Sequence, residues 1–276
     1  MTAPPPEPAA VPDRPGAPAP QVVAHRGASH DNAEHTLGAY LAAIEAGADA
    51  LECDVRLTAD GHLVCVHDRD LRRTASSRGV VSTMDLAELH ELDFAAWKNP
   101  WADLDDEAPE RDDDLDGVLT LRRLLETVAD AGRRVEVAIE TKHPTRFGGL
   151  VERRLVEMLG DFGWDRAGAP VRVMSFSYTA LQRVERLAPE VRLVQLLERA
   201  QLWPMLRRVV GSDWVMGPGI ALLRENPALA TRMQRSGHDV HVWTVNTEED
   251  LQLCRRLGVA AVITDRPGWV LETLGR

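Results

Sequence analysis

From residue 21 onward, short apolar runs alternate with amphipathic segments. Apolar runs of about four to eight residues predict buried strands, and apolar positions repeated every three or four residues predict helices with one buried face. The predicted strands cover residues 21–24, 51–57, 135–142, 171–177, 191–197, 214–217, 240–246 and 260–265. The predicted helices cover residues 36–46, 86–92, 120–131, 147–160, 179–187, 200–209, 224–236 and 248–257.

Strands that alternate with helices favour a parallel sheet, because a helical crossover returns the chain to the same edge. Eight strands fit such crossovers, and they end at His25, Asp54, Glu140, Ser177, Leu197, Gly217, Asn246 and Asp265. Eight is the number that closes a (β/α)8 TIM barrel, so we expect an α/β barrel with a small hairpin insertion after the second strand. A doubly wound open sheet is the alternative, but no glycine-rich dinucleotide loop follows the first strand.

The segment 51–68, LECDVRLTADGHLVCVHD, predicts two extended arms around a tight turn. A two-residue loop at Asp60-Gly61 would pair Ala59 with His62 and place Asp54 opposite His67. Alternation would put Glu52 and Asp54 on one face and apolar side chains on the other. Two acids on one strand face repel each other, so the hairpin points to a divalent cation between them.

Composition narrows the possible partners and the compartment. The 276-residue chain is 44% hydrophobic and carries a formal net charge of −11, which argues against nucleic acid or an anionic membrane surface as a partner. No apolar run approaches the roughly 18 residues that suggest a membrane span. Three cysteines are too few for a disulfide framework, and the hairpin register would put Cys53 and Cys65 on opposite faces. We therefore expect a soluble, cytoplasmic protein.

The N-terminal segment and one internal insert differ from the rest of the chain in composition. Residues 1–20 are mostly Pro and Ala and lack the regions of a secretory signal, so we expect a disordered tail before one domain over 21–276. Residues 102–117 form a strongly acidic insert. Asp112, Asp114 and Asp116 resemble the start of a calcium-binding loop, but Arg123 stands where that loop needs Glu. A solvated mobile loop is the favoured interpretation.

Charged side chains are expected at the carboxyl ends of several barrel strands, where the active sites of such barrels lie. The Glu140/Lys142 doublet alone is equally typical of a structural ion pair. A structural role does not explain the larger set, since unpaired charges are costly to bury. The set comprises His25, Arg26, Glu52, Asp54, His67, Glu140 and Lys142, with Trp243 beside it.

Several motifs together resemble the glycerophosphodiester phosphodiesterase family. They are HRGAS at 25–29, ECDVRLTADGHLVCVHD at 52–68, AIETK at 138–142, VWTVN at 242–246 and ITDRP at 263–267. The similarity spans nearly everything from residue 21 to residue 267. One departure stands at 33–36, where the family's usual Pro-Glu-Asn-Thr reads Ala-Glu-His-Thr.

The resemblance implies a role for each of these residues. It implies that His25 and His67 form the general acid/base pair and that Glu52, Asp54 and Glu140 bind Ca²⁺ or Mg²⁺. It also implies that Arg26 and Lys142 contact the phosphate, and it matches Glu34 to the family's acidic residue before the first helix. Trp243 is expected to flank the substrate as an apolar wall, with Phe176 a weaker candidate.

The remaining histidines have simpler interpretations. His241 lies deeper than Trp243 on the same face and is expected to be a core residue. Surface or loop positions are expected for His30, His35, His62, His90, His143 and His238.

These observations favour a metal-dependent phosphodiesterase that splits small glycerophosphodiesters into an alcohol and sn-glycerol 3-phosphate. Charge neutralisation would supply most of the stabilisation, and two histidines would transfer protons. A second hypothesis is lysophospholipase D-type hydrolysis of lysophospholipids, with an apolar entrance at 97–101. A third is a non-catalytic barrel that binds phosphorylated ligands, although this chain retains every acid and histidine that the family uses.

Overall fold

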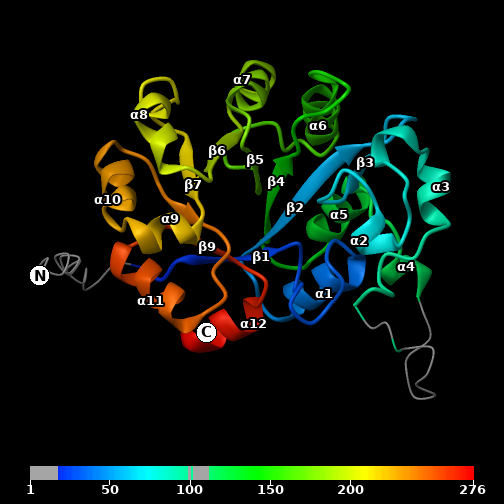
Figure 1. The fold of residues 1–276 in the computed structure, drawn as a ribbon, viewed down its shortest axis with the longest axis horizontal. Helices are drawn as coiled ribbons and strands as arrows, with labels where there is room; N and C mark the ends of the chain where they lie inside the picture. The colour runs from blue at the N-terminus through cyan, green and yellow to red at the C-terminus, as the bar shows by residue number, and fades with distance from the viewer. Residues whose placement is uncertain (1–17, 99–100, 102–111) are drawn as a thin grey trace, which may run out of the picture.

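The computed structural model describes residues 18–98, 101 and 112–276, so most of the expected N-terminal tail and residues 102–111 of the acidic insert lie outside the described residues. Eight parallel strands form the barrel that the sequence predicts (Figure 1). Two isolated parallel bridges, Met216 to Val240 and Gly219 to Trp243, join β7 to β8 and complete the ring. The barrel strands are β1 Gln21–His25, β2 Ala50–Leu57, β4 Glu136–Thr141, β5 Val171–Ser175, β6 Arg192–Leu197, β7 Val215–Pro218, β8 His241–Val242 and β9 Ala261–Thr264.

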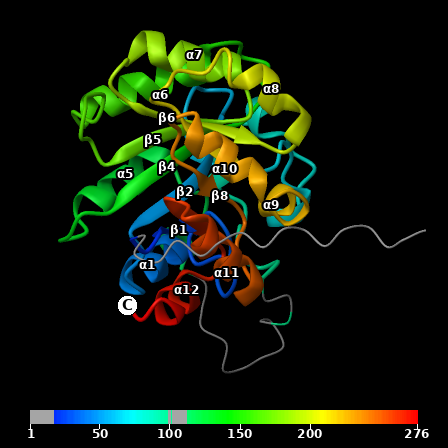
Figure 2. The same ribbon diagram turned by 90° about the vertical axis from the view of Figure 1, so that its left-hand side faces the viewer.

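Helices surround the ring, with α7 and α8 on the side opposite α1 and α12 in both views (Figures 1 and 2). Threonine N-caps begin three of them: the hydroxyls of Thr36, Thr120 and Thr247 accept backbone N–H bonds at the starts of α1, α5 and α11. The helices are α1 Leu37–Glu45, α2 Arg72–Ala75, α3 Leu86–His90, α4 Asp113–Asp116, α5 Leu121–Ala129, α6 Leu150–Asp161, α7 Tyr178–Leu187, α8 Trp203–Leu206, α9 Ile220–Glu225, α10 Ala228–Arg235, α11 Glu248–Leu257 and α12 Pro267–Thr273, with 3₁₀ turns η1 Val81–Thr83 and η3 Ala200–Leu202.

Two predicted helices differ from the structure. The helix expected at 224–236 is divided into α9 and α10, because Pro227 has no N–H to continue the ladder. The helix expected at 200–209 is reduced to η3 and the short α8. Helix α12 follows the last strand and was not predicted. No helix of the described residues is long and apolar enough to cross a membrane.

Alternation along each strand separates an outer core from the barrel interior. On β2, Leu51, Cys53 and Val55 pack outward against the helices. The inward residues in the middle of the strands are mostly apolar, including Ala50 of β2 and Ala138 of β4. Nearer the amino end of the barrel, Glu136 of β4 pairs with the buried Arg172 of β5 at 2.9 Å. Beyond the two alanines, the next inward residues are Glu52 on β2 and Glu140 on β4, so the apolar interior does not extend to the carboxyl end of the barrel.

The β2–β3 hairpin has a different register from the predicted one. The partners are Val55 with Cys65 and Leu57 with Leu63, where β3 is Leu63–Cys65. A tight type I′ turn needs positive φ at both central residues, but here Gly61 adopts it (φ 91°) and Asp60 does not. The loop therefore contains one more residue, and the Thr58 hydroxyl accepts the backbone N–H of His62 at 2.8 Å.

The altered register overturns two expectations. Cys65 lies opposite Val55 and joins the same outer core as Cys53, so the two thiols share a face instead of lying on opposite ones; both remain free. His67 does not pair with Asp54 in a ladder, since β3 ends at Cys65. His67 belongs instead to the loop that follows.

The described end of the acidic insert forms one short helix, α4. The Asp112 carboxylate accepts the backbone N–H groups of Asp114 and Leu115 at its N-terminus. These acids therefore cap a helix, which is an ordinary role for Asp at this position.

Candidate active site

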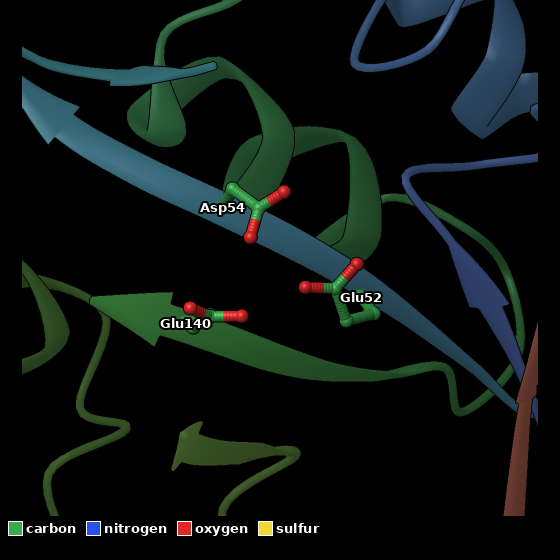
Figure 3. Close-up of side chains that lie close together, drawn as sticks. All are labelled: Glu52, Asp54 and Glu140. Carbon is green, nitrogen blue, oxygen red and sulfur yellow. The ribbon is translucent and has the colours of Figure 1, made fainter. Parts of the chain in front are cut away.

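Strand register brings three carboxylates to the carboxyl end of the barrel. Residue Asp54 of β2 is the neighbour of Glu140 of β4, and Glu52 lies two positions before Asp54 on the same inward face. Each side chain offers an oxygen atom within 4.8 Å of the other two, and all three residues are buried. Figure 3 shows the three carboxylates facing one another between β2 and β4.

Two cations lie against this cluster. The ammonium of Lys142 is 2.8 Å from the Asp54 Oδ1 atom and 2.8 Å from the Glu140 Oε1 atom. The Arg26 Nε atom is 3.1 Å from the Asp54 Oδ2 atom, and the Arg26 backbone N–H donates to Glu52. Burial would lower the pKa of Lys142, but the Asp54 and Glu140 carboxylates outweigh it and raise that pKa. Both cations are therefore charged at neutral pH.

Two cations do not balance the charge of three carboxylates. Burial and the Asp54 carboxylate raise the pKa of Glu140 to about 8 and raise the pKa of Glu52 well above its ordinary value. Burial opposes ionisation of Asp54 as well, but Lys142 and His35 hold its pKa well below the usual range. Three buried carboxylates that share only two neighbouring cations match the ligand preference of a hard divalent cation.

Asp265 orients His25. The His25 Nδ1 atom lies 2.6 Å from the Asp265 Oδ1 atom, which also accepts the Ser29 hydroxyl, and the Asn246 amide donates to the other oxygen. Burial would raise the pKa of Asp265, but these bonds, with His25 first, lower it to about 2. A carboxylate can only accept here, so the proton is on Nδ1 and Nε2 faces the cavity, 4.0 Å from Glu52.

His67, which lines the same cavity as His25, also has a carboxylate partner. Its Nδ1 atom lies 2.8 Å from the Asp68 Oδ1 atom, and the second Asp68 oxygen accepts the Arg73 guanidinium at 2.7 Å. The Arg56 guanidinium donates two bonds, at 3.0 and 2.7 Å, to the His67 carbonyl. Burial lowers the pKa of His67, and Lys142 and Arg26 add to that effect while Asp54 opposes it.

Glu34 links the two sides of the site. Its carboxylate accepts both ends of the Arg73 guanidinium, at 2.6 and 2.7 Å, and the Arg26 Nη1 atom at 3.1 Å. Burial alone would raise the pKa of Glu34, but Arg73 and Arg26 lower it to about 2. Both oxygens of the Glu34 carboxylate accept from guanidinium groups, so Glu34 can influence the rest of the site only by positioning Arg26 and Arg73.

Three histidines expected on the surface or in loops have defined contacts. His35 is 4% exposed, and its ring nitrogens lie 2.9 Å from Asp54 and 2.8 Å from the Tyr40 hydroxyl. His238 is also buried and bonds the Trp214 carbonyl, and His143 lies 2.8 Å from the buried Glu152. Burying a loop imidazole requires partners, which these residues have. His241 is buried as expected.

Two connected cavities open over these groups. The smaller one, of 110 Å³, is lined by His25, Arg26, Glu52, His67, Glu140, Lys142, Met174, Phe176, Leu196, Glu198, Trp243, Thr244 and Ile263. The larger one, of 580 Å³, shares His67, Glu140 and Lys142 with it. Trp243 and Phe176 both line the smaller cavity and meet edge to face, with ring centroids 5.5 Å apart.

Sequence reasoning missed the groups that hold the predicted residues in place. Asp265 could have been found, because it ends the last strand and that strand closes the barrel beside β1 and His25. Asp68 could have been found as well, because it directly follows His67 in the sequence. The motif departure at 33–36 includes His35 but did not indicate its contact with Asp54, and no sequence signal marked Arg73; His35 reaches the site from a loop and Arg73 from the short helix α2.

Comparisons with known proteins agree with this architecture. The sequence model of the Glycerophosphoryl diester phosphodiesterase family matches residues 25–269. The "Probable glycerophosphodiester phosphodiesterase 1" of Mycobacterium tuberculosis is 43% identical over 253 residues, covering 90% of each chain. The glycerophosphodiester phosphodiesterase of Bacillus subtilis is 33% identical, covering 89% of this chain and 83% of its own.

Solved structures have the same fold. A phosphodiesterase of Oleispira antarctica, solved in complex with its product sn-glycerol-3-phosphate, superposes with a TM-score of 0.77 at 25% identity, covering 94% of this chain and 98% of its own. The sequence match and the shared fold extend over the whole barrel. The chain therefore belongs to the glycerophosphoryl diester phosphodiesterase family, a family of phosphoric diester hydrolases.

Proposed function

We propose that the chain hydrolyses glycerophosphodiesters to an alcohol and sn-glycerol 3-phosphate with the help of a divalent cation. The observation that carries this proposal is one cavity shared by two imidazoles and by buried carboxylates whose oxygens lie within 4.8 Å of one another. The relatives named as glycerophosphodiester phosphodiesterases, and the structural neighbour with its glycerol phosphate product, support it.

Glu52, Asp54 and Glu140 would hold the cation, either Ca²⁺ or Mg²⁺. When bound, the cation would draw negative charge from the phosphodiester and so favour attack at phosphorus. The raised pKa values of Glu52 and Glu140 support this assignment, because both carboxyls need added positive charge to ionise together.

His25 and His67 would transfer the protons. Each has its Nδ1 atom on a carboxylate, Asp265 for one and Asp68 for the other, which leaves Nε2 available to the cavity. One imidazole would take the proton of the nucleophile, which is either water or the glycerol's own hydroxyl, and the other would donate a proton to the departing alcohol. If the glycerol hydroxyl attacks, water then opens the resulting cyclic phosphate to give sn-glycerol 3-phosphate. Such acid–base assistance contributes about 10²–10⁴-fold in rate.

Arg26 and Lys142 would attract the phosphate anion. Both lie at the floor of the smaller cavity and carry their charge among buried acids. Glu34 would act through Arg26, whose guanidinium it holds, and Trp243 would form an apolar wall for the glycerol or alcohol moiety.

A substrate panel tests the proposal. Glycerophosphocholine and glycerophosphoglycerol are incubated with protein treated with EDTA and then restored with Ca²⁺ or Mg²⁺, and sn-glycerol 3-phosphate is measured with a coupled dehydrogenase. We expect release only after metal is restored. Release of phosphocholine, or equal turnover in EDTA, would contradict the proposal.

Exposed apolar side chains favour a second candidate activity on lysophospholipids. Phe176, Leu202 and Met205 are 39%, 42% and 55% exposed and line the larger cavity, where an acyl chain could lie. They are on the side of α8, whereas the entrance predicted at 97–101 falls partly outside the described residues. Comparing turnover of lysophosphatidylcholine with glycerophosphocholine, with Met205→Lys as a test variant, would separate the two activities.

A further inference from the structure

A third cavity, of 250 Å³, lies beside the active site and has only positive charges among its charged side chains. Its basic residues are Arg56, Arg69, Lys142 and Arg146, and no Asp or Glu lines it. We call it the basic cavity. A local concentration of cations is unusual in a chain whose formal net charge is −11, because acidic residues outnumber basic ones overall.

The acids near the basic cavity are already paired. Asp54 and Glu140 bind Lys142, and Asp68 binds His67 and Arg73. Within the described residues, Arg69 and Arg146 form no ion pair; Arg146 donates at 3.3 Å to the Ser82 carbonyl and covers the Phe147 ring. Arg69 and Arg146 therefore have no paired acid among the described side chains.

The basic cavity adjoins the two active-site cavities, with which it shares lining residues. It shares Arg56, Arg69 and Lys142 with the 580 Å³ cavity, which in turn shares His67 and Lys142 with the small cavity over the carboxylates. Trp243 lines only the small cavity among these three. A diester bound at Lys142 would thus have one end toward Trp243 and the other toward the arginines.

We propose that the basic cavity binds a second anionic group, a phosphate or carboxylate, carried by the alcohol moiety of the diester substrate. This inference rests on the proposed function and specifies its substrate class. Arginine suits the task, since its planar fork binds phosphate and carboxylate oxygens in pairs. The cationic lining would also disfavour alcohols that carry a quaternary ammonium.

Glycerophosphoinositol and glycerophosphoinositol 4-phosphate test the proposal, because they differ by one phosphate on the alcohol. We expect higher kcat/KM for the phosphorylated substrate, and a preference that weakens as NaCl screens the arginines. Arg69→Gln should reduce the ratio of the two kcat/KM values by about 5-fold, and Arg69→Gln with Arg146→Gln by about 20-fold, as expected for partly exposed charge pairs. Arg166→Gln, at a 71% exposed position outside the three cavities, is the matched control.

The outcomes separate this inference from the proposed function. Turnover of both substrates with a ratio that the arginine variants leave unchanged would overturn only the basic-cavity assignment. Turnover of neither would count against the proposed function, and calorimetric titration with inositol 4-phosphate, which needs no catalysis, would then decide the assignment: binding lost in Arg69→Gln supports it, and no binding overturns it. Inhibition by inorganic phosphate that Arg69→Gln abolishes, with the substrate ratio unchanged, would assign the cavity to a free anion and overturn it too.

Discussion

The Nε2 atom of His35 lies 2.9 Å from the Oδ2 atom of Asp54, one of the three clustered carboxylates. The opposite ring nitrogen lies 2.8 Å from the Tyr40 hydroxyl, which donates to the Glu52 carbonyl at 3.1 Å. One buried loop imidazole thus connects to both acidic positions of β2. Partners of this kind fix the orientation of metal-binding carboxylates.

Replacing His35 should weaken divalent-cation binding. His35→Ala removes the bond to Asp54, and loss of such a partner typically costs about 10–100-fold in metal affinity. His35→Asn should lose less metal affinity than His35→Ala, because Asn tolerates the positive φ of 62° at this position. Some affinity should still be lost, because Asn cannot span Asp54 and Tyr40 together. Calorimetric titration with Ca²⁺ and Mg²⁺ measures the effect, with the exposed His90→Ala as control. Unchanged affinity in His35→Ala would rule out this role.

Asp265→Asn should lower kcat by about 100-fold or more while changing KM little. An amide can donate to His25 Nδ1 and so allow the wrong tautomer, which removes the free Nε2 lone pair. Steady-state kinetics would separate kcat from KM, and ¹⁵N chemical shifts of His25 would report the tautomer. Asp239→Asn, at an exposed pair with Arg192, is the control. An unaltered His25 tautomer in a slow variant would refute the explanation.

His67→Ala should abolish turnover while leaving the folded state nearly intact. The side chain is 34% exposed and lies in a loop at the edge of the cavities, so its loss should affect proton transfer more than stability. Activity assays and thermal unfolding should be run beside His62→Ala, a 54% exposed histidine in the turn of the preceding hairpin. Full activity in His67→Ala would exclude it as acid or base.

Glu34 should stabilise the fold in a pH-dependent way. Its pKa is about 2 in the folded state against an ordinary value of 4.5, so the stabilisation is complete above about pH 4.5 and disappears as pH falls through 2. The linked free energy is of order 3 kcal/mol. Urea unfolding should show Glu34→Gln destabilised at pH 7, with the difference from the unsubstituted protein shrinking toward pH 2.5.

A control and a contrary result complete this experiment. Glu157→Gln, on the 63% exposed side of an ion pair on α6, should change stability little at either pH. A Glu34→Gln deficit that stayed constant from pH 7 to pH 2.5 would show that packing, and not ionisation, accounts for it.

The strands and the carboxylate cluster could be predicted because both follow from alternation with a period of two. Once β2 and β4 are known to be adjacent parallel strands, alternation is enough to place Asp54 beside Glu140 on the inward face. The hairpin register was predicted wrongly because the loop has one residue more than the predicted two. That difference depends on the φ angles of Asp60 and Gly61, which the sequence pattern does not give.

Residues in loops and in the short helix α2 could not be placed by such reasoning. His35 has positive φ and bonds Asp54, 19 residues further along the chain. Arg73 binds both Asp68 and Glu34, and Glu34 is 39 residues away in sequence. Neither arrangement has a periodic signature. The structure was needed to show that each candidate histidine has its own carboxylate partner.

The Arg56 guanidinium holds the His67 carbonyl and also lines the basic cavity. Changes at Arg69 or Arg146 can alter which alcohols the cavity admits without touching that support, whereas a change at Arg56 would disturb His67 at the same time. Natural variation in substrate range should therefore accumulate at the two outer arginines, and directed evolution of new head-group preferences should begin there.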